Sequence, residues 1–212
     1  RRVVPLRWWW APSPIVATGL YEGETHDARQ EVTGWDAPGF DAAGWSPADV
    51  LASASFGAVL EAPTGPPVRV IESLKPVKVV RRADGRILLD FGQNIAGRLR
   101  VSFRARPGAA VELHHAEVLE DGELSTRPLR SATSVDRYLP ARAGAVDWSP
   151  RFAIHGFRYA EIRGLDTLDD LDAVVALVIH SDMTRSGWFD TDDPLLGRFH
   201  ENVVWSKRAK FV

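Results

Sequence analysis

The chain has 212 residues, of which 45% are hydrophobic and 25% charged, values typical of a globular protein with a substantial core. Its formal net charge of −2 lacks the basic surplus that nucleic acids and anionic membranes require of a partner. It has no cysteine, which excludes disulfides, cysteine-bound zinc and a thiol nucleophile, and no apolar run near the roughly 20 residues of a membrane helix.

The N-terminal segment mixes short strand-like runs with loops. Residues 15–17 and 30–32 are predicted strands, and Gly34–Trp45 is rich in Gly, Pro and Asp, which favours a loop. We expect the aromatic side chains of this loop to hold it against a sheet. The chain has eight tryptophans, which can fill a β-sandwich core or form flat platforms for sugars, and the first use is commoner. The run from Ala62 to Pro67 marks the best domain boundary.

From Val68 onward the pattern indicates β-structure. Residues 98–104 alternate between polar and apolar, so Leu99, Val101 and Phe103 are predicted to face one side. Residues 111–114 alternate likewise, and Arg106-Pro107-Gly108 between them predicts a hairpin. Further strands are predicted at residues 87–89, 135–139, 158–162 and 173–179, the last apolar enough to be buried on both faces.

The periodicity changes at Asp192-Asp193-Pro194, a typical helix start because an aspartate can cap free N–H groups and proline fits the first turn. Leu196, Phe199 and Val203 then recur at spacings of three and four and form one apolar helical face. The basic residues at 207, 208 and 210 suit the end of a helix.

One group of residues is a candidate metal site. His114 and His115 are adjacent on a predicted strand and point to opposite faces, so they cannot bind the same ion. His115 and Glu117 share a face, but the sequence shows no third ligand beside them. We interpret this segment as polar residues at the end of a strand.

Acidic residues are the other candidates. Glycoside hydrolysis needs two carboxyl groups across the scissile bond, one of them with a raised pKa, and no acid here stands in an apolar context that would raise it. The acidic run 166–172 is interpreted as a solvated loop, with calcium binding as the second choice, because it lacks a known calcium-loop spacing. No G-x-S-x-G motif is present. The residues alone favour an all-β interaction or binding module.

Six segments together resemble signatures of the bacterial α-L-rhamnosidases of glycoside hydrolase family 78. They occur in the family's order and at its approximate spacing, and they cover nearly the whole chain from Ile15. The segments are Tyr21–Arg29, Asp90–Gly97, His115–Leu119, Arg130–Ala132, Phe152–Tyr159 and His180–Asp182.

The resemblance implies a mainly β fold with three parts. Residues 1–62 are similar to the C-terminal part of the family's N-terminal jelly-roll module, which is carbohydrate-binding-like, and residues 66–182 to its antiparallel β-sandwich domain. Residues 183–212 are similar to the linker and short helix that lead into the catalytic (α/α)6 barrel. The run Asn202–Arg208 matches the lead-in to the family's acidic stretch, although Lys210 stands where the family usually has Asn.

The resemblance also implies a function. The parent enzyme is expected to hydrolyse terminal non-reducing α-L-rhamnose with inversion, acting on rhamnosylated small molecules or glycans. The family's catalytic acids have no counterparts in this chain, so we assign no catalytic, cofactor-binding or metal-binding residue and expect no cofactor. The expected role is structural, with the catalytic barrel of the same polypeptide as partner and neither nucleic acid nor membrane. The alternative is a stand-alone carbohydrate-binding module for rhamnosylated glycans.

The segment His155–Tyr159 allows two interpretations. A scaffolding role is favoured, with Phe157 and Tyr159 on one face of a strand and Arg158 paired to Glu161 or Asp182. The alternative hypothesis is that this segment borders the active-site cleft of the parent enzyme.

Overall fold

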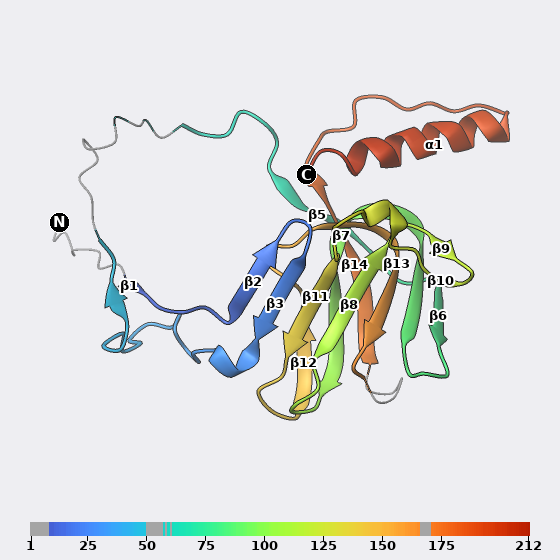
Figure 1. Ribbon diagram of the computed structural model, residues 1–212. Helices are drawn as coiled ribbons and strands as arrows, with labels where there is room; N and C mark the ends of the chain where they lie inside the picture. The colour runs from blue at the N-terminus through green and yellow to red at the C-terminus, as the bar shows by residue number, and fades with distance from the viewer. Residues whose placement is uncertain (1–8, 50–56, 58, 60, 166–170) are drawn as a thin grey trace.

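The computed structural model describes residues 9–49, 57, 59, 61–165 and 171–212, and every structural statement below concerns these residues. The central feature is one large curled β-sheet, and one α-helix lies near the C-terminus (Figure 1). The prediction of a mainly β fold with a short C-terminal helix is confirmed.

Most of the strands are short, and the longest is β7 (Ile87–Ala105), with 19 residues. The other elements in chain order are β1 (Trp9–Trp10), β2 (Ile15–Gly19), β3 (Gly23–Asp27), the 3-10 turn η1 (Ala28–Gln30), β4 (Ser46–Pro47), β5 (Val68–Leu74), β6 (Lys78–Arg81), β8 (Val111–Ala116), β9 (Leu119–Glu120), β10 (Glu123–Leu124), the 3-10 turn η3 (Arg127–Leu129), β11 (Val135–Leu139), β12 (Gly144–Trp148), β13 (His155–Arg163), β14 (Leu171–Ser181) and α1 (Pro194–Arg208).

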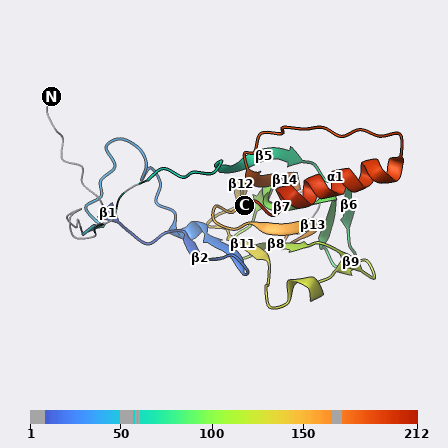
Figure 2. The same ribbon diagram turned by 90° about the horizontal axis from the view of Figure 1, so that it is seen from above.

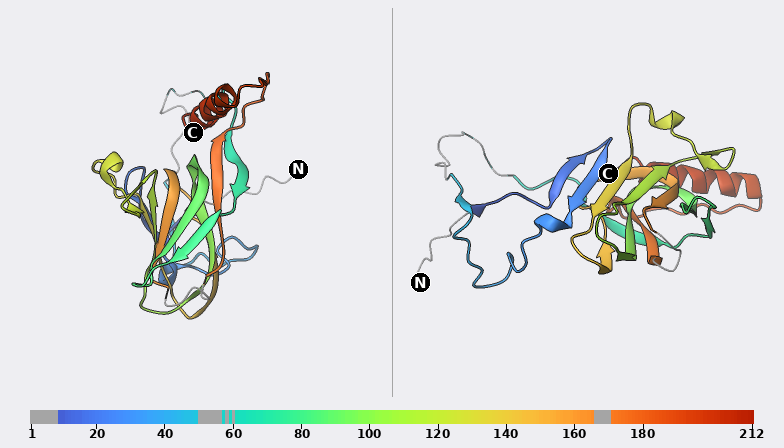
Figure 3. Two further views of the ribbon diagram at one scale, coloured as in Figure 1. Left: turned by 90° about the vertical axis from the view of Figure 1, so that its right-hand side faces the viewer. Right: turned by 60° about the horizontal axis from the view of Figure 1, so that its bottom comes forward.

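The long strand β7 organises the sheet because it pairs with four others. Its first half pairs with β6 and β13, and its second half pairs with β12 and β14. The order across the main sheet is β2-β3-β11-β8-β13-β7-β14-β5. Because β7 changes partners along its length, the sheet curls, and its strands stand in two facing layers (Figure 3, left).

The change of partner takes place at Gly97. This residue is paired with His155 of β13 and also with Val178 of β14. A Cβ atom at Gly97 would lie 2.0 Å from the carbonyl oxygen of Leu177, so only glycine lets the backbones approach this closely. The last residue of the Asp90–Gly97 motif therefore has a purely structural requirement.

The core fills the space between the two layers. Leu99, Val101 and Phe103 are at most 1% exposed, which confirms the prediction that they share the inner face of their strand. The ring of Phe103 packs edge-on against Tyr138 of β11, with ring centroids 5.8 Å apart. Burial of such large apolar side chains is the main source of stability in a sandwich of this kind.

The predicted hairpin between residues 98–104 and 111–114 is wrong. β8 pairs with β11 and β13, and it has no register with β7. Both edges of the second half of β7 are already occupied by β12 and β14, so after Arg106-Pro107-Gly108 the chain continues on the far side of β13. The turn itself was predicted correctly, but strands from later in the sequence pair with β7 in place of β8.

Two smaller predictions also fail. Residues 30–32 form no strand, because Asp27 accepts hydrogen bonds from the backbone N–H and the guanidinium of Arg29 and thereby closes the turn η1. The apolar strand β14 is not buried on both faces: Ala176 and Val178 are buried, whereas Ala173 is exposed. The acidic run 166–172 lies mostly outside the described residues.

The N-terminal segment joins the main sheet through β2 and β3. β3 runs parallel to β11, and all other pairs of the main sheet are antiparallel. Beyond η1 the chain leaves the sheet and returns at β5 (Figure 2). The strands β2 and β3 thus share a sheet with strands from beyond residue 66, while the division into 1–62, 66–182 and 183–212 stays a prediction.

The helix α1 forms where the sequence predicted it. The Asp193 carboxylate caps the first turn by accepting from the N–H groups of Leu195 and Leu196, and Pro194 occupies the first turn. The helix touches the sheet through Trp205, which packs against the core, and through an ion pair of Arg208 with Glu72 at 3.9 Å. In the described part of the chain no helix is long and apolar enough to cross a membrane.

Candidate functional site

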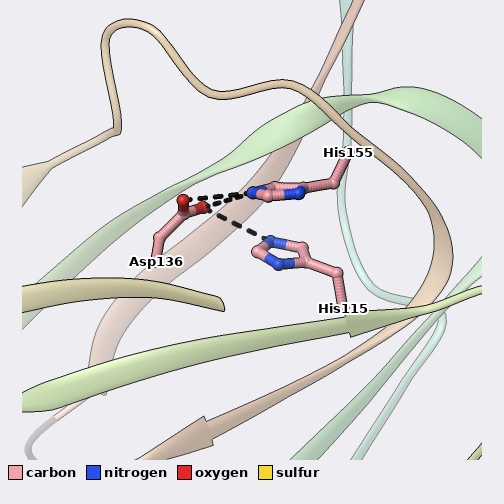
Figure 4. A group of neighbouring side chains, drawn as sticks. All are labelled: His115, Asp136 and His155. Carbon is pink, nitrogen blue, oxygen red and sulfur yellow. Dashed lines mark hydrogen bonds and ion pairs between the residues drawn. The ribbon is translucent and has the colours of Figure 1, made fainter. Parts of the chain in front are cut away.

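Two buried histidines and an aspartate meet where three core strands run side by side. His115 comes from β8, Asp136 from β11 and His155 from β13, and β8 is paired with both of the others. Their side chains converge inside the sheet (Figure 4), with candidate ligand atoms all within 4.8 Å of one another and at most 4% of any residue exposed. We call these three residues and Ser134 the histidine–aspartate cluster.

Hydrogen bonds fix the orientation of both rings. Nε2 of His155 donates to both carboxylate oxygens of Asp136, at 3.1 Å each, and its Nδ1 lies 3.0 Å from Oγ of Ser134. Nδ1 of His115 lies 3.1 Å from the carbonyl oxygen of Ser134, which can only accept, so this nitrogen carries the proton. Nε2 of His115 is left with a lone pair, 3.9 Å from Asp136 and without a hydrogen-bond partner.

The electrostatics of the cluster keep His115 neutral. Burial, together with the neighbouring His155, lowers the pKa of His115 from 6.5 to about 3. Burial would raise the pKa of Asp136, but the hydrogen bond from His155 and the two imidazoles outweigh it and hold that pKa below its usual value. The cluster therefore contains a charged carboxylate beside a neutral imidazole.

The ring geometry suits hydrogen bonding better than metal coordination. The rings of His115 and His155 are stacked, with centroids 4.3 Å apart and planes inclined by 20°. A metal ion lies in the plane of each imidazole that binds it, about 2.1 Å from the nitrogen. An ion on the lone pair of one of these rings would lie well out of the plane of the other, so the cluster as arranged serves the packing of β8, β11 and β13.

Two members of this cluster had been singled out in the sequence. His115 continues the inward-facing positions of Val111 and Leu113, which is a signal for burial, and His155 belongs to a recognised motif. Glu117, which we had placed on the face of His115, is exposed beyond the end of β8 and accepts instead from Asn94. Asp136 was not singled out, because nothing local marks it as the partner of histidines 19 and 21 residues away.

The motif Tyr21–Arg29 is joined to the cluster by a buried glutamate. The N–H of Glu24 donates to Asp136 at 2.8 Å, and Oε2 of Glu24 accepts from the N–H groups of Arg151 and Phe152 at 2.9 and 2.8 Å. Glu24 is 1% exposed. This side chain therefore ties β3 to the segment before β13.

Another carboxylate, that of Glu161 on β13, is fully buried. Arg163 and Arg86 approach it to 2.7 and 3.0 Å, and Arg82 to 3.7 Å. The same two arginines from before β7 also bind Glu123 near the surface. We call Arg82, Arg86, Glu123, Glu161 and Arg163 the arginine–glutamate cluster.

The segment His155–Tyr159 differs in detail from its prediction. Arg158 pairs with Asp90 through two hydrogen bonds of 2.9 and 3.0 Å, and not with Glu161 or Asp182. The register shifts between Phe157 and Tyr159, so Phe157 is buried while Tyr159 is only partly so. A bulge at this point interrupts the alternation on which the prediction rested. These contacts favour scaffolding, and the alternative that the segment borders an active site stays a hypothesis.

The Asp90–Gly97 motif behaves as a strand with a local bend. Gly92 has φ of 75°, a left-handed conformation that favours glycine, and its N–H donates to Asp90 at 2.7 Å. Because Asp90 also holds Arg158, one carboxylate fixes both the bend in β7 and its neighbour β13. The hydrogen bond from Arg158 holds the pKa of Asp90 below its usual value.

Most of the chain matches the models of two known protein domains. Residues 5–72 match the model of the α-L-rhamnosidase N-terminal domain, and residues 80–180 match that of the bacterial α-L-rhamnosidase concanavalin-like domain. An α-L-rhamnosidase of Streptomyces avermitilis is 37% identical over 206 residues. That alignment covers 97% of this chain and 20% of the relative.

Solved structures of α-L-rhamnosidases also resemble this chain. The native α-L-rhamnosidase of Aspergillus terreus is 39% identical with a TM-score of 0.84, and that of Dictyoglumus thermophilum is 32% identical with a TM-score of 0.87. Each match covers 95% of this chain and 23% of the other. The chain thus spans about a fifth of the length of the relatives that it matches.

Proposed function

We propose that this chain, which belongs to the bacterial α-L-rhamnosidase family, is a non-catalytic β-rich part of an enzyme that removes terminal non-reducing α-L-rhamnose by inverting hydrolysis. The matched domains are the N-terminal and concanavalin-like ones, over about a fifth of each relative. The substrates of the parent enzyme would be rhamnosylated small molecules or glycans. Its two catalytic carboxyl groups would lie outside the part of the chain that the structure describes.

The state of the carboxyl groups supports a non-catalytic role. A glycosidase needs a general acid whose pKa is raised, so that it carries a proton at working pH. In the described residues every carboxyl group with a clear pKa shift is shifted downward, because hydrogen bonds and charges of arginine, histidine or backbone partners outweigh burial. These are Asp27, Asp84, Asp90, Glu112, Glu123, Asp136 and Asp147. Such groups serve as permanent anions rather than proton donors.

The observation that carries the proposal is the uncovered apolar surface around α1. Leu196, Phe199 and Val203, which form the predicted apolar face of the helix, are 51%, 66% and 49% exposed. In the preceding loop Trp188 is 77% exposed. A helix normally buries its apolar stripe, and exposed patches of this kind mark contacts with another domain or protein. We propose that the catalytic barrel of the parent enzyme covers this surface.

Turnover tests the proposal directly. The purified 212-residue chain, incubated with 4-nitrophenyl α-L-rhamnopyranoside, is expected to release no nitrophenol above the uncatalysed rate. Turnover that disappears when a single carboxyl group is replaced would overturn the proposal, because it would place a catalytic acid in this chain.

The uncovered surface allows a second measurement on the same chain. Phe199→Ser combined with Val203→Ser is expected to reduce the binding of a hydrophobic fluorescent dye while leaving the thermal midpoint within about 3 °C of the parent chain. Leu99→Ser is the matched control in the core and is expected to unfold the chain. A comparable loss of stability from the helix variant would show that this face packs inside the domain, contrary to the proposal.

A further inference from the structure

The loop Glu117–Ser134 connects β8 to β11, and we call it the β8–β11 loop. It contains the short hairpin of β9 and β10 and the turn η3. The turn η3, drawn in yellow, stands at the same end of the sandwich as α1 (Figure 1 and Figure 3, left). The loop also includes the recognised motif Arg130–Ala132, to which the proposed function gives no role.

The two buried clusters hold the β8–β11 loop at both ends. Near its start, Glu123 of β10 forms ion pairs with Arg82 and Arg86 of the arginine–glutamate cluster. At its end, Ser134 belongs to the histidine–aspartate cluster, and its N–H donates to the carbonyl oxygen of Tyr21 at 3.0 Å. The middle of the loop is therefore presented on a rigid base, which is how folds commonly position functional side chains.

Arg130, in the middle of this loop, has a backbone conformation that suits glycine. Its φ is 56° and its ψ is −110°. The N–H of Ala132 donates to the carbonyl oxygen of Leu129 at 2.9 Å, so a β-turn forms with Arg130 as its first central residue. The angles are those of a type II′ turn, in which this position is normally glycine. An arginine here is strained, and such strain persists only where the surrounding structure imposes it, most often at functional sites.

The strain at Arg130 differs from that of its neighbours. The three non-glycine residues with a positive φ in the described part of the chain all lie in this loop. Asp121 begins an Asp-Gly hairpin turn, in which a positive φ is favoured. Ser134 is held by its hydrogen bonds with the two buried histidines. Arg130 has neither explanation, so its strain points to a use of its side chain outside this domain.

The side chain of Arg130 lacks a partner. Arg130 is exposed, and its guanidinium forms no hydrogen bond or ion pair with any residue that the structure describes. The nearby acids of the loop are already paired, Glu120 with Arg127 at 2.8 Å and Glu123 with the arginine–glutamate cluster. A guanidinium has a planar set of donors that matches a carboxylate through two parallel hydrogen bonds. A carboxylate from outside the described residues is therefore the partner that fits.

The uncovered face of α1 indicates where this carboxylate comes from. The apolar face of the helix is exposed at the same end of the sandwich as the β8–β11 loop. The alignment with the Streptomyces avermitilis enzyme covers only 20% of that relative. A large domain that covered α1 would also stand over this loop.

We infer that Arg130 anchors the catalytic barrel of the parent enzyme by binding a carboxylate on the barrel surface. The inference rests on the proposed function and deepens it, because it names the residue and the chemistry by which the two domains recognise each other. The strained turn holds the guanidinium in place before the domains meet, which lowers the entropy lost on docking.

Two variants of the 212-residue chain separate the strain from the guanidinium. Arg130→Ala removes the side chain but keeps the strain, and it is expected to leave the thermal midpoint within about 1 °C of the unsubstituted chain. Arg130→Gly also relieves the turn, and its midpoint is expected to lie about 2 °C or more above that of Arg130→Ala. A clear loss of stability in Arg130→Ala would reveal a partner within the domain, and equal midpoints would show an unstrained turn. Either result would overturn the inference.

The full-length parent enzyme tests the partner. Arg130→Gln is expected to lower the thermal midpoint of the enzyme by about 1 °C or more, and less in high salt, while the midpoint of the 212-residue chain stays unchanged. Arg127→Gln is the matched control, because this arginine lies on the same loop and pairs within it. It is expected to change enzyme and chain alike. If Arg130→Gln also changed both alike, the inference would be wrong.

Two further measurements separate the inference from its alternatives. Rhamnoside turnover by the unsubstituted full-length protein tests the proposed function, and its absence would overturn the function and the inference together. An active enzyme that Arg130→Gln does not destabilise would contradict the inference alone. Inorganic phosphate, added to the 212-residue chain, tests for a free anion. A rise of the thermal midpoint with phosphate that Arg130→Gln abolishes would assign the guanidinium to a soluble anion and overturn the inference.

Discussion

Asp136 and Glu161, the carboxylates that are 0% exposed among the described residues, are held in opposite ways. Asp136 is paired with histidines that are themselves buried, so the whole histidine–aspartate cluster lies in the core. Glu161 is paired with arginines whose side chains are 21–42% exposed and reach inward from the surface. An arginine keeps its charge at every accessible pH, whereas a histidine does not. The charge of the histidine–aspartate cluster therefore depends on pH, whereas the arginines of the arginine–glutamate cluster keep their charge.

Removing each carboxylate is the strongest way to test this contrast. Asp136→Ala leaves the N–H groups of His155 and Glu24 without an acceptor in the core and is expected to reduce the free energy of unfolding by about 3–5 kcal/mol. Glu161→Ala is expected to cost about 1–2 kcal/mol, because Arg86 keeps Glu123 and Asp84 and the arginines can reach water. Urea unfolding at neutral pH measures both. Equal losses would show that burial alone, and not the kind of partner, sets the cost.

The pH dependence of stability tests the histidine–aspartate cluster. The pKa of His115 is about 3 in the folded chain and 6.5 unfolded, so below pH 6.5 the unfolded chain binds a proton that the folded chain does not. Stability should therefore fall as pH is lowered from about 6.5 toward 3, by up to about 1.4 kcal/mol per unit from this group. The lowered pKa of Asp136 adds a loss with the same sign at the acid end of this range.

The variant for this prediction is His115→Gln, and the unsubstituted chain is its control. His115→Gln is expected to lower the free energy of unfolding at neutral pH. It is also expected to make the decline between about pH 6.5 and 4 less steep, by the slope that corresponds to close to one bound proton. Urea unfolding at several pH values gives the slopes. An undiminished slope in His115→Gln would mean that the core does not hold this imidazole neutral.

The smallest expected effect comes from the outer part of the arginine–glutamate cluster. Glu123 is 47% exposed, and its partners Arg82 and Arg86 both retain Glu161. Glu123→Gln is therefore expected to reduce the free energy of unfolding much less than Glu161→Ala does, and less still at high salt, where surface charges are screened. Thermal unfolding in low and high salt checks this. A loss as large as that of Glu161→Ala would mean that the inner carboxylate depends on the outer one.

Local patterns were enough to predict several of the elements. The predicted strand 135–139 is the observed β11, and the helix starts at the capping residue Asp193 as predicted. Each of these features depends on residues only a few positions apart. The strand follows from the alternation of polar and apolar residues, and the helix start follows from a side chain that accepts hydrogen bonds from the next N–H groups. The predicted hairpin after β7 failed because both edges of this part of β7 pair with β12 and β14, which begin much later in the chain, at Gly144 and Leu171.

The sequence by itself determined the family, the β-rich class and the inward face of the second half of β7, because motif order and periodicity are properties of neighbouring residues. Only the tertiary structure decided which strands pair, and with them the histidine–aspartate cluster. Asp136 meets His115 and His155 because β8 lies between β11 and β13, and Glu24 meets Asp136 because β3 joins the same sheet. Such encounters depend on close approach in three dimensions, which the spacing of residues along one strand does not encode.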